Sequence, residues 1–393
     1  MYLHKQTQAI RIQTPKSEER EHSTPLFLSS SFTFDSAEEM RAAFAEETDD
    51  NIYSRYSNPT VDEFVAKVCA LEGAEAGFAT ASGMAAVFNS IFALLQAGDH
   101  LICCSSVFGS TYALATKFLP KYGITCTLVS ATNYAEWEAA LQPNTKMVYL
   151  ETPTNPQLEV IDLQWVGEFC SKNNLIFNVD NCFASPILQN PIEFGAHVVS
   201  HSATKWIDGQ GRVLGGVIVG KAELIRDIYL FCRNTGPTMS AFNAWVLSKS
   251  LETLDVRLER HCNNALEVAK MLETHPAVSW VKYPFLPSHP QHAIAIKQMK
   301  KGGGVVCFEI KGGVEAGRKF LDSLQMLSMT PNLGDTRSIA THPASTTHSK
   351  LTEAERLAIG ITPGLIRISC GLEHVEDIIT DIKTALSLAY TEQ

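Results

Sequence analysis

Residues 147–180 read MVYLETPTNPQLEVIDLQWVGEFCSKNNLIFNVD, in which a short apolar run, an amphipathic stretch and a second apolar run follow one another. Short apolar runs are typical of buried strands, and apolar residues spaced at about 3.6 positions are typical of a helix that covers them. The stretch therefore predicts a strand–helix–strand unit whose second strand ends at Asp180.

The same rhythm continues on both sides of this unit. Toward the N-terminus, GFATA and HLICC each precede an amphipathic stretch, MAAVFNSIFALLQ and TYALATKFLPKYG. This alternation predicts an α/β fold with a mostly parallel sheet that helices cover on both faces. Ligands of such sheets bind at the carboxyl ends of the strands.

The chain has 393 residues, which is too long for one ordinary hydrophobic core. Residues 1–60 are polar and lack periodicity, so they are predicted to form an extended arm. Residues 61–250 form the predicted larger domain. A long helical pattern over residues 241–275 leads into a smaller α+β domain, residues 251–393, with the strands GGVVCFEIKG and LIRISCG.

Composition excludes several classes of function. The chain is 45% hydrophobic and 19% charged, and its net charge of −10 includes no basic cluster. A folded protein that binds neither nucleic acid nor an anionic membrane is expected. The ten cysteines lack CxxC pairs and zinc-site spacing, so reduced thiols and no metal site are expected. Because no signal peptide or long apolar segment is present, the predicted location is cytoplasmic.

Lys205 lies in HVVSHSATKWIDGQGRVLGGVIVG, residues 197–220, where it follows an apolar strand within a Ser/Thr-rich turn. A lysine that forms an imine must be rigid and partly desolvated, because only the neutral amine attacks a carbonyl. Small neighbours leave room for a cofactor ring. The alternative is an ordinary surface lysine in a loop.

Asp180 ends the apolar strand of LIFNVDNCFASP. A carboxylate beside a pyridine nitrogen keeps that nitrogen protonated and strengthens the ring as an electron sink. Asp180 followed by Lys205 therefore indicates pyridoxal 5'-phosphate (PLP), although an Asp that caps a turn or helix is the common alternative.

Two further patterns point to anion sites. In ATASGMAAVFNSIFALL, the backbone N–H groups of Ser82, Gly83 and Met84 begin a helix and suit a phosphate, although ordinary capping gives the same pattern. Arg367 lies within an apolar strand, where it needs a carboxylate partner such as that of a substrate. Hydroxyl donors to the phosphate are expected from Ser202 and Thr204.

The motifs YSRYSNPT, SGMAA, ETPTNP, VDNCFASP, SATK and RISCGLE together resemble the Cys/Met-metabolism PLP enzymes. The resemblance covers about residues 20–390 and is closest to the cystathionine gamma-synthase-like branch. It implies the type I, aspartate aminotransferase-like fold of PLP-dependent transferases, with a mostly parallel seven-stranded sheet and a smaller C-terminal α+β domain.

The resemblance also implies a role for each matching residue. Lys205 is the Schiff-base lysine and proton carrier, and Asp180 contacts the pyridine nitrogen. Tyr53 and Arg55 reach the phosphate of a neighbouring subunit, which implies a homotetramer built from two dimers, with shared active sites. The phosphate is held by Ser82, Gly83, Met84, Ser202 and Thr204, and the substrate carboxylate is oriented by Asn155, Arg367 and Ser338.

Departures from the family pattern bear on the reaction. Phe108 replaces a tyrosine that stacks on the cofactor ring, so stacking remains but the acid/base role of the phenol is lost. Ser110 replaces the cysteine of methionine gamma-lyases, and Arg337 replaces a glutamate of lyases and synthases. With GDTRSIATHPASTTH, these residues resemble the O-succinylhomoserine sulfhydrylases, which make homocysteine from an activated homoserine and sulfide. Arg337 is a candidate partner for a succinyl carboxylate.

Several alternatives remain open at this stage. An O-acetylhomoserine sulfhydrylase, a cystathionine gamma-synthase, or a cystathionine or methionine gamma-lyase uses the same cofactor residues. A PLP-binding protein without catalysis is a remote alternative, which the presence of Lys205, Asp180 and Arg367 disfavours. A nucleotide-binding dehydrogenase is excluded because no GxGxxG follows the first strand.

Overall fold

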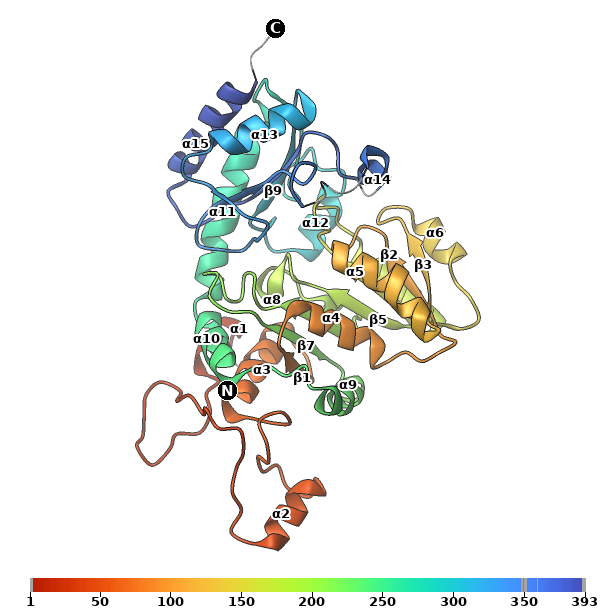
Figure 1. Ribbon diagram of the computed structural model, residues 1–393, viewed down its shortest axis with the longest axis vertical. Helices are drawn as coiled ribbons and strands as arrows, with labels where there is room; N and C mark the ends of the chain where they lie inside the picture. The colour runs from red at the N-terminus through yellow and green to blue at the C-terminus, as the bar shows by residue number, and fades with distance from the viewer. Residues whose placement is uncertain (1–2, 348, 350–351, 359, 391–393) are drawn as a thin grey trace.

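The computed structural model describes residues 3–347, 349, 352–358 and 360–390. Its strands form two sheets, and its helices surround them (Figure 1). The strands are β1 (Ala76–Thr80), β2 (His100–Cys104), β3 (Thr125–Val129), β4 (Thr145–Glu151), β5 (Ile176–Asp180), β6 (Val198–Ser202), β7 (Gly216–Gly220), β8 (Val278–Lys282), β9 (Val305–Ile310), β10 (Ser328–Met329), β11 (Ile339–Thr341) and β12 (Leu365–Ser369). The helices are α1 (Lys5–Arg11), α2 (Ala37–Phe44), α3 (Pro59–Glu72), α4 (Gly83–Phe92), α5 (Gly109–Ala113), α6 (Tyr134–Ala139), α7 (Leu163–Asn173), α8 (Ser185–Leu188), α9 (Ala222–Thr235), α10 (Ala241–Leu251), α11 (Leu254–Glu273), α12 (His292–Gln298), α13 (Gly313–Ser323), α14 (Glu353–Ala358) and α15 (Val375–Ala389), with a π-helical turn η1 (Leu114–Phe118) and 3₁₀ turns η2 (Leu119–Tyr122) and η3 (Pro191–Phe194).

The larger sheet has seven strands in the order β1-β7-β6-β5-β4-β2-β3. Strand β7 is antiparallel to both of its neighbours, and the other pairs are parallel. The predicted α/β fold with a mostly parallel seven-stranded sheet is therefore confirmed. The sequence analysis did not predict β3, an edge strand of sequence TCTLV whose side chains are mostly only half-buried.

Three adjacent parallel strands of this sheet end at the same edge. Glu151 on β4 pairs in register with Asp180 on β5, and Asp180 pairs in turn with Ser200 on β6. Helix α4 packs on one face, where Asn178 of β5 donates to the carbonyl of Ser90. Helix α3 packs on the opposite face. The carboxyl ends of β4, β5 and β6 therefore lie side by side at one edge of the sheet.

The smaller sheet has five strands in the order β10-β11-β12-β9-β8. A separate hydrophobic core lies between this sheet and helices α11, α13 and α15, and includes Phe308, Phe320 and Ile366. Figure 1 shows this sheet above the larger one, with α11 running between them along one side. The boundary near residue 250 stays a prediction of the sequence.

The long helical pattern of residues 241–275 forms two helices rather than one. The carbonyl of Ser250 accepts from the backbone N–H of Thr253 at 3.2 Å and from the guanidinium of Arg257 at 3.0 Å. These contacts take the place of the regular i to i+4 bond, so α10 ends at Leu251 and α11 begins at Leu254. The helical pattern of the sequence did not show this break.

The N-terminal segment is also more ordered than an extended arm, because it contains α1 and α2. The chain doubles back at a bridge between Ser31 and Tyr53, and α2 projects away from the rest of the molecule (Figure 1). Buried Glu63 on α3 accepts from the backbone N–H of Thr14 at 2.7 Å and pairs with Lys67 at 3.0 Å. These contacts anchor the start of the segment.

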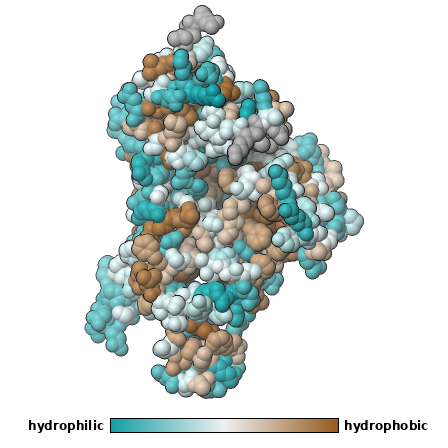
Figure 2. Space-filling model, viewed as in Figure 1, coloured by the Kyte–Doolittle hydropathy of each residue, from teal (hydrophilic) through white to brown (hydrophobic). Residues whose placement is uncertain are grey.

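Hydrophobic residues gather along the middle of the face shown in Figure 2, between the C-terminal sheet and the projecting arm. All ten cysteines are free thiols and most are buried, as expected. None of the helices in the described part of the chain has the length and apolar character needed to cross a membrane.

Candidate active site

Lys205 lies in the turn that follows β6, with its amide bonded to the carbonyl of Ser202. The side chain is half-buried, and its Nζ donates to Oδ1 of Asn332. Burial lowers the pKa of Lys205, and the nearby charge of Arg367 lowers it further, while Cys182 acts in the opposite direction. A lysine in this environment has more neutral amine at neutral pH than an exposed one.

Asp180 is the last residue of β5, and its carboxylate is buried. Burial raises the pKa of this carboxyl, against the stabilising effects of the Cys182 amide, His201 and the Tyr149 hydroxyl. The Cys182 amide donates to Oδ1 at 2.9 Å, and the Tyr149 hydroxyl donates to Oδ2 at 3.5 Å. The carboxylate therefore keeps acceptor capacity for a further donor.

Glu151 joins this site, although the sequence analysis gave it no role. It is buried at the end of β4, and its pKa is raised well above the usual range by burial and by the charge of Asp180. Its carboxyl accepts from the backbone N–H of Phe108 at 2.9 Å. Glu151 thus holds the loop that presents Phe108. Its place at the end of an apolar strand, like that of Asp180, was the signal available in the sequence.

The predicted phosphate site is formed where α4 begins beside β6. The hydroxyl of Ser82 caps α4 by accepting from the Ala85 amide at 3.1 Å. A Cβ placed on Gly83 would lie 2.5 Å from Cβ of Ser202, so the turn approaches β6 more closely than a side chain allows. The structure therefore brings Ser82, Gly83 and Ser202 together at a helix N-terminus.

The side chains of the other two residues predicted at the phosphate, Thr204 and Met84, contact protein groups. The hydroxyl of Thr204 accepts from the amide of Gly215 at 3.0 Å and donates to its carbonyl at 3.3 Å. Met84 follows Gly83 in α4, and its sulfur lies 4.0 Å from the hydroxyl of Thr111. Thr204 thus fastens the turn before Lys205 to the segment before β7.

Arg367 is buried on β12 of the smaller sheet. Its guanidinium donates to Asn155 Oδ1 at 3.0 Å and to the carbonyls of Pro331 and Asn332 at 2.9 and 3.1 Å. Burial lowers the pKa of Arg367, and Cys307 and Glu151 oppose that shift. Asn332 therefore links Arg367 to Lys205, and this role was not predicted from the sequence.

Ser338 and Arg337 are engaged with protein groups. The fully buried hydroxyl of Ser338 donates to Glu373 at 2.9 Å and accepts from the amide of Gly371 at 2.8 Å. Arg337 is exposed and forms a two-point pair with Asp335, at 2.9 and 3.0 Å. This pair raises the pKa of Arg337. Ser338 is thus placed to hold the loop rather than to offer a free hydroxyl.

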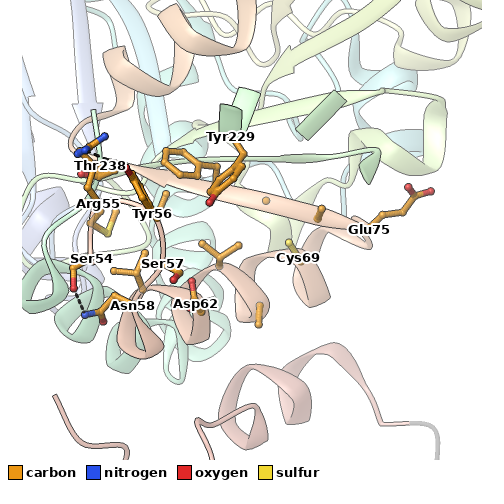
Figure 3. A pocket seen from close by; sticks show the side chains of 18 residues that line it. Ser54, Arg55, Tyr56, Ser57, Asn58, Asp62, Cys69, Glu75, Tyr229 and Thr238 are labelled. Carbon is orange, nitrogen blue, oxygen red and sulfur yellow. Dashed lines mark hydrogen bonds between the residues drawn. The ribbon is translucent and has the colours of Figure 1, made fainter. Parts of the chain in front are cut away.

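Arg55 lies beside β1, the edge strand of the larger sheet, and Tyr53 pairs with Ser31 in the N-terminal segment. The guanidinium of Arg55 donates to the carbonyl of Arg233 and stands 4.8 Å from the ring centre of Tyr56. Figure 3 shows Arg55 beside Thr238 in a pocket that Tyr56 and Tyr229 also line. These contacts are made within one chain. The predicted reach of Tyr53 and Arg55 to a neighbouring subunit stays a prediction.

Phe108 precedes α5, and its ring is 45% exposed. Ser110 is also exposed, in the first turn of α5. Glu151 holds the backbone at Phe108, directly before α5. Within the described residues, no cluster of three or more His, Cys, Asp or Glu side chains is arranged to hold a metal ion.

The residues at this edge fit PLP. The buried carboxylate of Asp180 suits a ring nitrogen, the Ser82–Gly83 turn suits a phosphate, and the half-buried amine of Lys205 suits a carbonyl carbon. Among the described residues, the buried hydroxyl of Ser200, in register with Asp180, has no hydrogen-bond partner. The site thus has buried polar atoms left for a ligand.

The family model described as Cys/Met metabolism PLP-dependent enzyme matches residues 6–387 of the chain. The chain belongs to this family. It is a PLP-dependent enzyme that acts on amino acids in Cys/Met metabolism, as the sequence resemblance predicted.

Individual members of the Cys/Met metabolism family are similar over nearly their whole length. An O-succinylhomoserine sulfhydrylase of Pseudomonas aeruginosa is 44% identical, over 97% of this chain and 94% of the relative. An L-methionine gamma-lyase of Porphyromonas gingivalis is also 44% identical, over 92% of both chains. A solved structure from Campylobacter jejuni, described as a putative O-acetylhomoserine (thiol)-lyase with N'-pyridoxyl-lysine-5'-monophosphate at its position 205, has a TM-score of 0.94 at 32% identity, covering 98% of this chain and 100% of that one.

Proposed function

We propose that this enzyme joins sulfide to an O-acylated homoserine, most favourably O-succinylhomoserine, and releases homocysteine and the acyl carboxylate, a step of methionine biosynthesis. In this replacement the Cγ–O bond breaks, the carboxylate leaves with the bonding electrons, and hydrosulfide forms the Cγ–S bond. The observation that carries the proposal is the presence of Phe108, Ser110 and Arg337 in a chain that also has the cofactor residues of the family.

PLP, when bound, supplies an electron sink for the charge that develops on the substrate. Asp180 would hold a proton at the ring nitrogen, and Ser82, Gly83, Ser202 and Thr204 would hold or frame the phosphate. Lys205 would take the proton from the substrate Cα and return it, because burial favours its neutral, basic form. Phe108 would cover the ring by stacking.

Arg367 would bind the substrate carboxylate, with Asn155 fixing the orientation of the guanidinium at 3.0 Å. The link from Arg367 through Asn332 to Lys205 sets the position of the carboxylate relative to the base. Such fixed geometry lowers the entropic cost of reaching the transition state.

A gamma-lyase is the second candidate function, because a methionine gamma-lyase is as similar in sequence as a sulfhydrylase. Two side chains favour replacement over elimination. Phe108 lacks a hydroxyl that transfers protons, and Ser110 lacks a thiol. A cystathionine gamma-synthase and an O-acetylhomoserine sulfhydrylase differ only in the acceptor and in the acyl group.

The test supplies purified, PLP-loaded protein with O-succinyl- or O-acetylhomoserine, each with sulfide, with cysteine or without an acceptor. Homocysteine from the succinyl ester and sulfide, at the highest kcat/KM, is the expected result. Cystathionine from cysteine, or 2-oxobutanoate without an acceptor, as the dominant product would overturn the proposal. A cytoplasmic homotetramer is proposed with this function, and the mass of the native protein in solution tests the assembly.

A further inference from the structure

A buried pair of titratable side chains lies outside the site described above. Glu72 ends α3 and is fully buried, and His201 on β6 is 2% exposed. His201 Nε2 lies 2.7 Å from Glu72 Oε1. The two buried side chains are therefore hydrogen-bond partners, and the loss of either would leave the other without this partner in the protein interior.

The Glu72–His201 pair lies on the face of the sheet opposite to the one that carries the side chain of Asp180. Asp180 is in register with Ser200, so the side chains of these two residues point to the same face. His201 follows Ser200 and points to the other face, toward α3. The strand β6 therefore separates the Glu72–His201 pair from the face that carries Asp180.

The pair is linked to Asp180 through the next residue in the chain. Asn181 Nδ2 donates to Glu72 Oε1 at 2.8 Å, and Asn181 Oδ1 accepts from Gln189 at 3.0 Å. The Asn181 amide donates to the carbonyl of Ser200 at 3.0 Å. These hydrogen bonds fix the side chain and the backbone of Asn181, the residue that follows Asp180.

The pair also acts on Asp180 through space. His201 lowers the pKa of Asp180 and so opposes the effect of burial. The other titratable groups that face Asp180 are Tyr149 and Glu151 on β4 and Cys182 in the following turn.

We propose that Glu72 and His201 are positioning residues that hold Asp180 in place from the opposite face of the sheet. This inference rests on the role proposed above for Asp180 at the ring nitrogen. It requires nothing of the leaving group or the acceptor, because a fixed Asp180 carboxylate serves every reaction that begins with removal of the Cα proton.

The experiment uses the full-length protein with three changes: His201→Gln, Glu72→Gln and both together. The readouts are the Kd for PLP of the apoprotein, the pH midpoint of the visible absorbance of the loaded protein, and exchange of the substrate Cα hydrogen in D₂O. Each change should slow exchange by about 10-fold or more, because moving the carboxylate of Asp180 away from its productive geometry slows the reaction steeply. Slow exchange with an unchanged Tm separates a loss of positioning from a loss of folding.

The decisive comparison repeats the same changes in a protein that already carries Asp180→Asn. If His201 acts through Asp180, adding His201→Gln to Asp180→Asn should slow exchange by no more than about 2-fold. An equal loss in both backgrounds, or unchanged exchange and PLP affinity in all three variants, would overturn the proposal. If His201→Gln does not fold, the same comparison is made with Glu72→Gln, with and without Asp180→Asn. Unchanged exchange in Asp180→Asn itself would instead refute the role of Asp180, whereas a different acceptor preference would refute only the sulfhydrylase assignment.

Discussion

The guanidinium of Arg367 donates to Oδ1 of Asn155 at 3.0 Å, although the two residues are 212 positions apart in the sequence. Asn155 follows β4 of the larger sheet, and Arg367 lies on β12 of the smaller one. The substrate-binding part of the proposed site therefore depends on how the two sheets pack. The following predictions test this site.

Replacing Arg367 with Lys should reduce kcat/KM for the acyl homoserine by about 100-fold, mainly through KM, because a point charge cannot reproduce the two-point geometry of a guanidinium. Asn155→Ala should have a smaller effect, about 10-fold, since it removes only the group that orients Arg367. Steady-state kinetics measures both. Arg318→Lys, at an exposed pair with Glu315, is the matched control. An unchanged KM in Arg367→Lys would remove this residue from the carboxylate site.

Gly83→Ala should weaken PLP binding by about 10-fold or more. The added Cβ would lie 2.5 Å from Cβ and 2.8 Å from Cα of Ser202, so the turn at the start of α4 has to move. Displaced N–H groups no longer point at the phosphate, and charge-assisted hydrogen bonds are worth about 1.5–3 kcal/mol each. Titration of the apoprotein with PLP measures the change, and Ala93→Ser at the other end of α4 is the control. Wild-type affinity in Gly83→Ala would place the phosphate elsewhere.

Asn332→Asp should raise the pKa of Lys205. The new carboxylate would take the position of Asn332 Oδ1, which accepts a hydrogen bond from Lys205 Nζ. A negative charge at this position favours the protonated amine and raises its pKa by about one to three units. Since only the neutral amine attacks the cofactor aldehyde, the midpoint of PLP incorporation with pH should move upward. Stopped-flow absorbance over a pH series measures this midpoint. Asn332→Ala should not raise it, and an equal upward shift in both variants would contradict the explanation.

Arg337→Ala should lower kcat/KM for the succinyl ester by about 10-fold and leave the acetyl ester within about 2-fold, because only the succinyl group carries a second carboxylate. The acetyl ester is thus the internal control. In the structure this arginine is paired with Asp335, so the succinyl carboxylate has to compete with that pair. Competition between the two esters measures the preference, and an unchanged preference would discard Arg337 as the acyl-recognition residue.

The sequence predicted the larger sheet well, because buried parallel strands carry continuous apolar runs that remain visible without tertiary information. The edge strand β3 was missed, since its side chains are only partly buried and its apolar pattern is weak. The division between α10 and α11 was also missed. It depends on Arg257, whose guanidinium reaches the carbonyls of Ser250, Trp206 and Ile207 only after folding.

The sequence by itself determined the chemistry of the site: a lysine and an aspartate at strand ends, a small-residue turn before a helix, and an arginine in an apolar strand. These features are local, so residue type and spacing are enough to show them. Only the tertiary structure decided which side chains are free and which are engaged. It placed Asn332 between Lys205 and Arg367, engaged Ser338 with Glu373, and set the Glu72–His201 pair behind Asp180. Such partners come from distant parts of the chain, and burying a polar group without a partner costs free energy once the core excludes water, so most buried polar groups are paired.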